Sequence, residues 1–220
     1  FKQNLAFGAS SITNRDVSCF IAKLNATDPA FPVVSLRAIG GTDGICRAYA
    51  MQVDKNTGNV YVAGEFSGSI NFEGVSRQSS VGSFDAFLLK YSSGGEKLEW
   101  AVTLGGRGSD RFNSLAINTK DEIIAGGYAE AQTTVRNANG TTQTFTTGGS
   151  LIDGLVASFT PNGSLLWTST IASQHVDYVQ SVSVDGSNFV YASGAFSRTA
   201  NFGSADIRLT SAGSTDGFVA

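Results

Sequence analysis

A long internal repeat constrains the fold of this chain more than any other feature of its sequence. The step from Trp100 to Trp167 equals the step from Gly127 to Gly194. Each period holds four short apolar runs that are rich in Val, Ile, Phe and Tyr and bounded by Gly, Asn, Asp or Ser, which is typical of β-strands. No window shows the apolar spacing of an amphipathic helix. The sequence therefore predicts an all-β protein that repeats a four-stranded unit of about 65 residues.

The four runs of a unit can be followed by short anchors. The clearest copies lie at residues 48–54, 59–66, 85–91 and 98–104, and then at 112–118, 122–129, 152–159 and 165–171. A repeated unit of four antiparallel strands predicts a β-propeller blade. By analogy with other propellers, the first run lies nearest the axis, and the fourth, which contains Trp, lies outermost. We expect about three and a third blades: an incomplete one at 1–47, complete ones at 48–111 and 112–177, and an incomplete one at 178–220.

A propeller typically closes with four to eight blades. An unclosed blade leaves a strand edge unpaired, which proteins normally avoid. We therefore expect the ring to be completed by further blades of the same chain or by other protein chains.

Three stretches carry a resemblance to a known family. Gly105-Gly106 through Asp110, the run at 58–64, and Asp85-Ala-Phe87 are similar to the repeat of the bacterial seven-bladed β-propeller repeat proteins. The resemblance covers essentially the whole chain, although Ala172-Ser173 replace the family's Gly pair and Val34 stands where it has Trp. It implies a secreted or surface-exposed repeat scaffold and no single shared enzymatic activity.

Composition limits the classes of partner. Hydrophobic residues make up 41% of the chain and charged residues only 15%, with 26 glycines, a turn-rich profile that we interpret as secreted or cell-surface. The net charge of −3 gives no basic footprint for nucleic acid. No apolar run approaches the ~18 residues of a membrane helix, so we expect no membrane insertion.

Cys19 and Cys46 are the two cysteines of the chain. Both are expected near strand ends on the same rim of a blade, so a disulfide is geometrically possible and would fit an oxidising compartment. The alternative is two small buried side chains with free thiols.

Aspartates recur at fixed phases of the repeat, among them Asp43, Asp110 and Asp177 in turns. An Asp in a turn accepts bonds from backbone amides and fixes the loop, and we favour this role. Calcium remains an alternative, although it needs six to eight oxygens and no run of closely spaced carboxylates is present. We expect no other cofactor.

The sequence shows no catalytic constellation. His175 is the only histidine, and it lacks the partners of a triad or a zinc site, so we interpret it as a turn residue. Trp100 and Trp167 occupy equivalent positions, and we favour packing between blades over a role as sugar platforms.

Two kinds of surface feature are expected in loops. Asn25, Asn139 and Asn162 begin sequons for N-glycosylation, which are informative only for a secreted eukaryotic protein. The insertion between the second and third runs of the second complete blade contains Asn139-Gly140 between β-formers, a signal for a tight hairpin. We expect this hairpin to project from the rim, to be dispensable for folding, and to offer Val135, Arg136, Asn139 and Gln143 for contacts. The alternative is a hairpin without a binding role.

These observations favour a non-catalytic structural or adhesive β-propeller scaffold. Its rim loops would contact proteins or glycans, and it could assemble into a larger extracellular structure. The alternatives are a glycan-binding, lectin-like propeller, and part of an enzyme whose active site lies in other blades.

Overall fold

The computed structural model of the protein describes residues 3–7, 10–14, 19–30, 32–40, 43–73, 76–148 and 151–220. These residues form an all-β structure of antiparallel sheets, with a single 3₁₀ turn, η1 (Ser93–Gly95), and no α-helix. The all-β prediction is therefore confirmed.

The N-terminal part of the chain forms two small sheets. Their strands pair antiparallel in sequence order: β1 (Gln3–Phe7) with β2 (Ser10–Asn14), and β3 (Cys19–Leu24) with β4 (Val33–Ile39).

Next along the chain comes the seven-stranded sheet. Four consecutive strands form its body: β5 (Asp43–Val53), β6 (Val60–Phe72), β8 (Asp85–Tyr91) and β9 (Leu98–Gly106). Three short strands extend it: β7 (Ser76–Ser79) on β6, and the hairpin of β12 (Gln132–Arg136) and β13 (Thr142–Thr146) on β9.

The remaining strands form a six-stranded and a three-stranded sheet. The first contains β10 (Arg111–Ile117), β11 (Ile123–Glu130), β14 (Ile152–Phe159), β15 (Leu165–Ala172), β18 (Thr199–Phe202) and β19 (Ser204–Thr210). The second contains β16 (Tyr178–Val184), β17 (Val190–Phe196) and β20 (Asp216–Val219).

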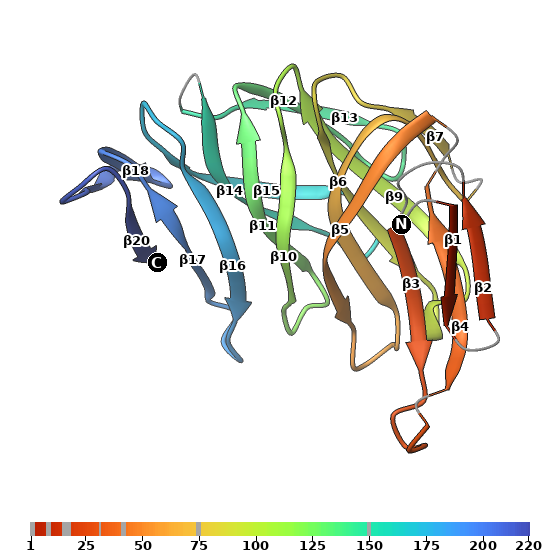
Figure 1. Ribbon diagram of the computed structural model, residues 1–220. Helices are drawn as coiled ribbons and strands as arrows, with labels where there is room; N and C mark the ends of the chain where they lie inside the picture. The colour runs from red at the N-terminus through yellow and green to blue at the C-terminus, as the bar shows by residue number, and fades with distance from the viewer. Residues whose placement is uncertain are drawn as a thin grey trace.

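The sheets follow one another in sequence order, as Figure 1 shows, and their first strands β5, β10 and β16 are neighbours. Because each large sheet is packed on both faces, its strands read as continuous apolar runs and not as alternating ones. On β8, Ala86 and Leu88 enter one core, whereas Phe87, Leu89 and Tyr91 enter the next. The two faces of one strand thus supply two separate cores.

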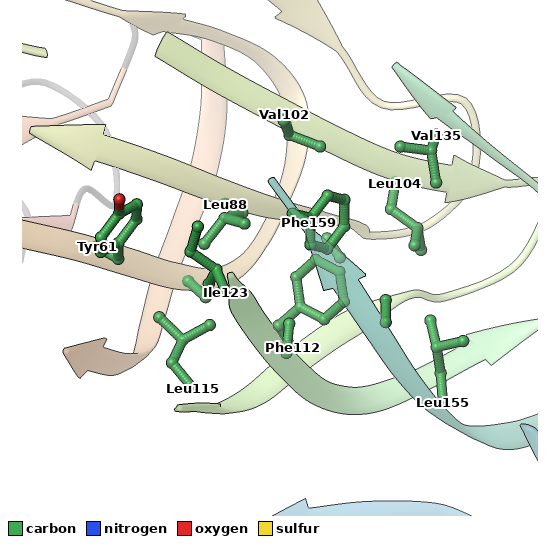
Figure 2. Packing of buried hydrophobic residues seen from close by; sticks show 14 of the residues in the cluster. Tyr61, Leu88, Val102, Leu104, Phe112, Leu115, Ile123, Val135, Leu155 and Phe159 are labelled. Carbon is green, nitrogen blue, oxygen red and sulfur yellow. The ribbon is translucent and has the colours of Figure 1, made fainter. Parts of the chain in front are cut away.

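The core between the seven-stranded and six-stranded sheets is built from both sheets in this way. Leu88, Val102 and Leu104 meet Phe112 and Phe159 there, as Figure 2 shows. The rings of Phe112 and Phe159 lie edge to face with centroids 6.1 Å apart, a favourable aromatic geometry.

A recurrent glycine allows the second strand of each unit to approach the first. The first strands carry a register irregularity near Ala48, Phe112 and Val179. A Cβ added at Gly64, Gly127 or Gly194 would lie 1.9, 1.9 or 2.0 Å from the carbonyl oxygen of Arg47, Arg111 or Tyr178. Glycine is therefore required at this position of the second strand, because the backbone of the first strand lies too close for a side chain where the strand pair is irregular.

The hairpin of β12 and β13 differs from its prediction. Its tight turn with Gly140 at φ 84° is present, but the hairpin does not project freely. Instead β12 pairs with β9 of the preceding sheet, from Thr133 opposite Gly106 to Arg136 opposite Thr103. The hairpin of β18 and β19 pairs in the same way with β15. Each hairpin therefore joins the sheet formed by the preceding stretch of chain.

This pairing corrects two further expectations. The Trp-containing strand β9 is not the outermost strand, because β12 and β13 lie beyond it. Val135 is not a contact residue of a rim, because it is fully buried in the core with Leu104. Arg136, Asn139 and Gln143 are exposed. Residues 132–146 of the segment 112–177 thus belong to the sheet that is otherwise formed by the preceding stretch of chain.

Candidate functional site

Cys19 and Cys46 form a disulfide with their Cα atoms 5.3 Å apart. Cys19 begins β3 and Cys46 lies in β5, so the bond joins two successive sheets, and not two points of one sheet. Both residues belong to the core that the β3–β4 sheet shares with the seven-stranded sheet. A disulfide is consistent with an extracellular protein.

Asp110 and Asp177 each accept hydrogen bonds from donors on both sides of the crossing between two successive sheets. Asp110 Oδ2 accepts a bond from the amide of Gly106 (3.1 Å), and Oδ1 accepts bonds from the amide of Glu130 and the hydroxyl of Thr133 (3.2 Å each). These donors lie at the end of β9 and at the entry to the hairpin that pairs with it. The carboxylate thus fixes the point at which the chain crosses between sheets, which is the turn-fixing role expected for it.

Asp177 makes the same kind of contacts in the next unit. Asp177 accepts bonds from the amides of Ser173 (2.7 Å) and Ser197 (2.8 Å), which stand at the repeat positions of Gly106 and Glu130. Burial raises the pKa of Asp110 to about 7, against the effect of the bonds from Glu130 and Gly106, and it also raises the pKa of Asp177. Asp43 begins β5, but its side chain lies outside the described part of the structure.

The Asp that begins the third run has a more local role. Asp85 accepts bonds from the amides of Val81 (3.0 Å) and Gly82 (3.4 Å), and Asp216 accepts one from Ala212 (2.7 Å). Each therefore orders the loop that precedes its own strand. No group of three His, Cys, Asp or Glu side chains that could hold a metal ion occurs among the described residues.

A third set of turn carboxylates and amides was not identified from sequence. Asn118 accepts bonds from the amides of Lys120 and Glu122, and Asp185 accepts bonds from those of Ser187 and Phe189, all at 2.9 Å. The bond from Phe189 is the main reason that the pKa of Asp185 lies below its ordinary value. Asn118 and Asp185 each end the first apolar run of their unit, and this recurrence in the sequence could have indicated a shared role in the turn that follows.

The two tryptophans occupy equivalent strands but different environments. Trp100 is 8% exposed, and its Nε1 donates to the carbonyl of Pro161 (3.1 Å) in the turn between β14 and β15. Gly163 of the same turn lies over its ring, since an added Cβ would be 3.0 Å from Cδ2. Trp167 is 40% exposed. Packing against the next sheet is therefore the observed role of Trp100.

Trp167 borders an apolar groove of about 510 Å³. The groove lies between the six-stranded and three-stranded sheets, and its lining includes Trp167, Ile171, Val190, Ile207, Leu209 and Val219. In the described part of the chain, β20 is the last strand of the three-stranded sheet. At the preceding junction, the corresponding position is occupied by β15 and the turn that covers Trp100.

The three sequons lie at exposed asparagines, Asn25, Asn139 and Asn162. In the first two, the Asn side chain accepts bonds from the amide and hydroxyl of the Thr two residues later. Such Asx turns are typical of surface loops.

His175 borders a hollow of about 550 Å³ with a polar lining, here called the polar hollow. The lining includes Gln174, His175, Arg198, Thr199, Asn201 and Arg208. None of its described lining residues is a carboxylate. The amide of His175 donates to Ser173 Oγ (2.9 Å), so the residue is part of an ordered turn, as expected.

Sequence reasoning missed the arginines of the polar hollow. The repeat itself held the signal, because the residues at the same positions as Arg198 and Asn201 in the preceding unit are Ala131 and Thr134. Neither of those residues is basic, whereas in the first complete unit Asn71 stands opposite Arg77 as Asn201 stands opposite Arg208.

The sequence matches none of the known protein-family models, and no curated protein matches it. Among the described residues, no helix has the length and apolarity needed to cross a bilayer.

Proposed function

We propose that the chain is a non-catalytic structural or adhesive scaffold of a secreted or cell-surface protein, and that its sheets are blades of a β-propeller. Three features support this: the sequence repeat, the sequence-ordered sheets with adjacent first strands, and the disulfide between two sheets. The similarity to bacterial seven-bladed propeller repeats points to the same architecture.

The observation that carries the proposal is the contrast between the two tryptophans. Trp100 is covered by the following blade, whereas Trp167 stays 40% exposed beside an apolar groove. Leu209 pairs with Ala200 as Phe145 pairs with Thr133, and it is 46% exposed although Phe145 packs against a core. An apolar face of this kind next to an open strand edge marks an interaction surface.

The partner of this face is therefore a further β-strand with its preceding turn. Such a strand would pair with β20 and cover Trp167, as β15 and its turn cover Trp100. It would be supplied by a further blade, from the same polypeptide or from another chain.

A peptide of residues 160–173 provides a direct test, because it contains the turn and strand that cover Trp100. The peptide carries Trp167→Phe, and the protein carries Trp100→Phe, so that only Trp167 of the protein emits. We expect saturable binding with a blue shift and reduced acrylamide quenching of Trp167.

The matched control is the same peptide with Gly163→Val. A Cβ at this position meets a tryptophan ring at 3.0 Å, and the residue has φ 73°, so the control is expected to bind much more weakly. Equal binding of both peptides, or an unchanged Trp167 emission at millimolar peptide, would contradict the proposal.

A further inference from the structure

Strand β13 forms one outer edge of the seven-stranded sheet. It pairs with β12, and among the described residues no other strand pairs with it. Its residues are exposed, apart from the partly buried Phe145. An edge strand presents a row of free N–H and C=O groups that can pair with another chain. The edge of β13 is therefore a surface that can bind a further strand.

The hydrogen bonds at both ends of the hairpin show which groups of β13 face outward. The amide of Asn137 donates to the carbonyl of Thr141 (2.9 Å), and the amide of Thr147 donates to the carbonyl of Ala131 (3.0 Å). Residues of an antiparallel pair alternate between bonded and non-bonded positions, so the odd-numbered residues of β13 bond to β12. The even-numbered residues point their amides and carbonyls away from the hairpin: Thr142, Thr144 and Thr146.

The outer strands of the other two hairpins differ from β13 at one position. Thr144 stands opposite Thr134, which lies seven residues after the recurrent glycine of its unit. At the same position, the outer strands β7 and β19 have arginines, Arg77 and Arg208. A charged residue on an edge strand discourages pairing with another chain. Two of the three hairpins thus have the charge that protects an edge, and β13 lacks it.

The sequence of this edge also favours pairing. The stretch 141–147 reads TTQTFTT and contains no charged residue, proline or glycine. Threonine and phenylalanine are enriched in strands, and short segments of high β-propensity and low charge are typical of strands that pair between chains. The Oγ1 atoms of Thr134 and Thr144 lie 3.0 Å apart, so a hydrogen bond already orders the middle of the edge. This order lowers the entropy that is lost when the edge is paired.

The edge is complementary to a second copy of itself. Its outward-facing residues are threonines at regular spacing, and the row reads the same in both directions. With a two-fold axis at Thr144, this residue stands opposite its own copy, and Thr142 stands opposite Thr146 of the second copy. Interfaces with a two-fold axis are self-complementary in this way. Each opposed pair of threonines would exchange its two free N–H and C=O groups.

This register also keeps like charges apart. Arg136 is the only charged residue of β12 and β13. Its row continues across the interface into Thr146 and Gln132 of the second copy, so the two copies of Arg136 lie at opposite ends of the joined strands. On the other face of the sheet, Gln143 stands opposite Phe145 of the second copy and can cover the exposed part of its ring.

We propose that two copies of the chain associate through β13, with these strands antiparallel about a two-fold axis at Thr144. The two seven-stranded sheets then join into one continuous sheet. No residue of β13 lines the apolar groove beside Trp167. The proposal is therefore independent of the scaffold proposal, and each can fail without the other.

The test is sedimentation velocity of the chain from micromolar to near-millimolar concentration, where we expect a reversible equilibrium between monomer and dimer. Thr144→Arg reproduces the residue of the other two hairpins and places two like charges against each other at the two-fold axis. We expect dimerisation of this variant to be at least about tenfold weaker. Thr144 is exposed, so the melting temperature of the dilute chain should not change.

Gln132→Arg is the matched control. It adds the same charge to the same exposed face of the hairpin, but on β12 and not on the edge strand, and it is expected to dimerise as the wild type does. Thr144→Pro is a second variant of the edge. It removes an outward-facing amide that makes no bond to β12, so the hairpin should form and the dimer should be lost.

Cysteine cross-linking tests the register. Opposed residues in a bonded antiparallel pair have Cα atoms about 5.5 Å apart, a separation that a disulfide can span. Under mild oxidation, Thr144→Cys alone is expected to give a covalent dimer, whereas Thr142→Cys alone is not. A mixture of Thr142→Cys and Thr146→Cys chains should give the covalent dimer again.

Several results would contradict the proposal. A wild-type chain that stays monomeric at all concentrations, or a Thr144→Arg variant that dimerises as tightly as the wild type, would each do so. Equal weakening by Gln132→Arg would mean that added charge opposes association without any role of the edge. Dimers that persist in Thr144→Arg and protect Trp167 from acrylamide would place the contact at the apolar groove instead.

Discussion

At the scale of single residues, the glycine that recurs in the second strand of each unit is required by a close contact with the backbone of the first strand. Gly127 lies against the carbonyl oxygen of Arg111 at a point where the strand pair is irregular. A methyl group there would lie 1.9 Å from that oxygen, and no flexible side chain can move aside.

Gly127→Ala is therefore expected to lower the free energy of unfolding by about 2 kcal/mol or more, as overpacking does in other cores. Gly186 is the control, because an added Cβ there meets nothing within 4 Å. Urea denaturation of both variants measures the difference. Similar stabilities for the two would show that the strands separate at little cost.

Asp110 makes the stability of the protein depend on pH. Its pKa of about 7 in the folded state lies above the ~3.9 of an unfolded Asp, so the folded state holds the proton more tightly between these values. Stability from this group is greatest below about pH 4 and is lost as the pH rises towards 7.

Asp110→Asn removes this titration. We expect the stability advantage of the wild type over the variant to be larger at pH 4.5 than at pH 7.5, as measured by chemical denaturation. A larger advantage at pH 7.5 would mean that the bonds from Gly106, Glu130 and Thr133 outweigh the cost of burying the charge.

The roles of these aspartates could be predicted only in part. A recurrent Asp beside Gly predicts a carboxylate that accepts amide bonds, and Asp110 does so. Its second donor, the amide of Glu130, is 20 residues away and comes close because β11 pairs with β10, and the third donor, Thr133, comes close because β12 pairs with β9. Local turn chemistry cannot reveal a partner of that kind.

At the scale of elements, the hairpins connect successive sheets. The sequence predicted the hairpin at Asn139-Gly140 from its turn, but its pairing with β9 depends on a strand from the preceding unit. The apolar Val135 between the polar Thr134 and Arg136 was the available signal, because an apolar residue between polar ones predicts a strand with one buried face.

Val135→Ala is expected to cost about 2 kcal/mol, because the side chain is fully buried among Leu104 and its neighbours. Gln143 stands directly opposite Val135 in the hairpin and is exposed, so Gln143→Ala should change stability by no more than about 0.5 kcal/mol. Equal melting temperatures for the two variants would restore the earlier interpretation of a dispensable hairpin.

The disulfide also connects two successive sheets, near the N-terminal end of the described structure. It closes a loop between residues 27 apart and joins β3 to β5. Constraint of the unfolded chain by a loop of this length contributes about 3 to 4 kcal/mol.

Cys19→Ser with Cys46→Ser is expected to lose this amount in urea denaturation, and reduction of the wild type should reproduce the loss. A reduced wild type with an unchanged denaturation midpoint would show that the packing of β3 and β4 on the seven-stranded sheet suffices without the bond.

At the scale of the whole molecule, the repeat predicted four runs per unit, and these are present as β5, β6, β8 and β9 and as β10, β11, β14 and β15, but the sheets contain further strands from the insertions. It could not predict which residues are unusual among the units. Trp100 and Trp167 occupy equivalent positions in the repeat, but in the described structure the turn before β15 contacts Trp100, and Trp167 is more exposed.

This asymmetry gives a prediction for the isolated chain. In Trp100→Phe only Trp167 emits, and in Trp167→Phe only Trp100 does. Because Trp167 is 40% exposed and Trp100 is 8% exposed, acrylamide should quench the first variant severalfold more strongly than the second. If instead both quench equally weakly, Trp167 is already covered, and analytical ultracentrifugation should then show association between copies of the chain through the apolar groove. Equal and strong quenching would mean that the turn at Pro161 and Gly163 does not hold Trp100 in solution, and the packing between successive sheets would be looser than the structure shows.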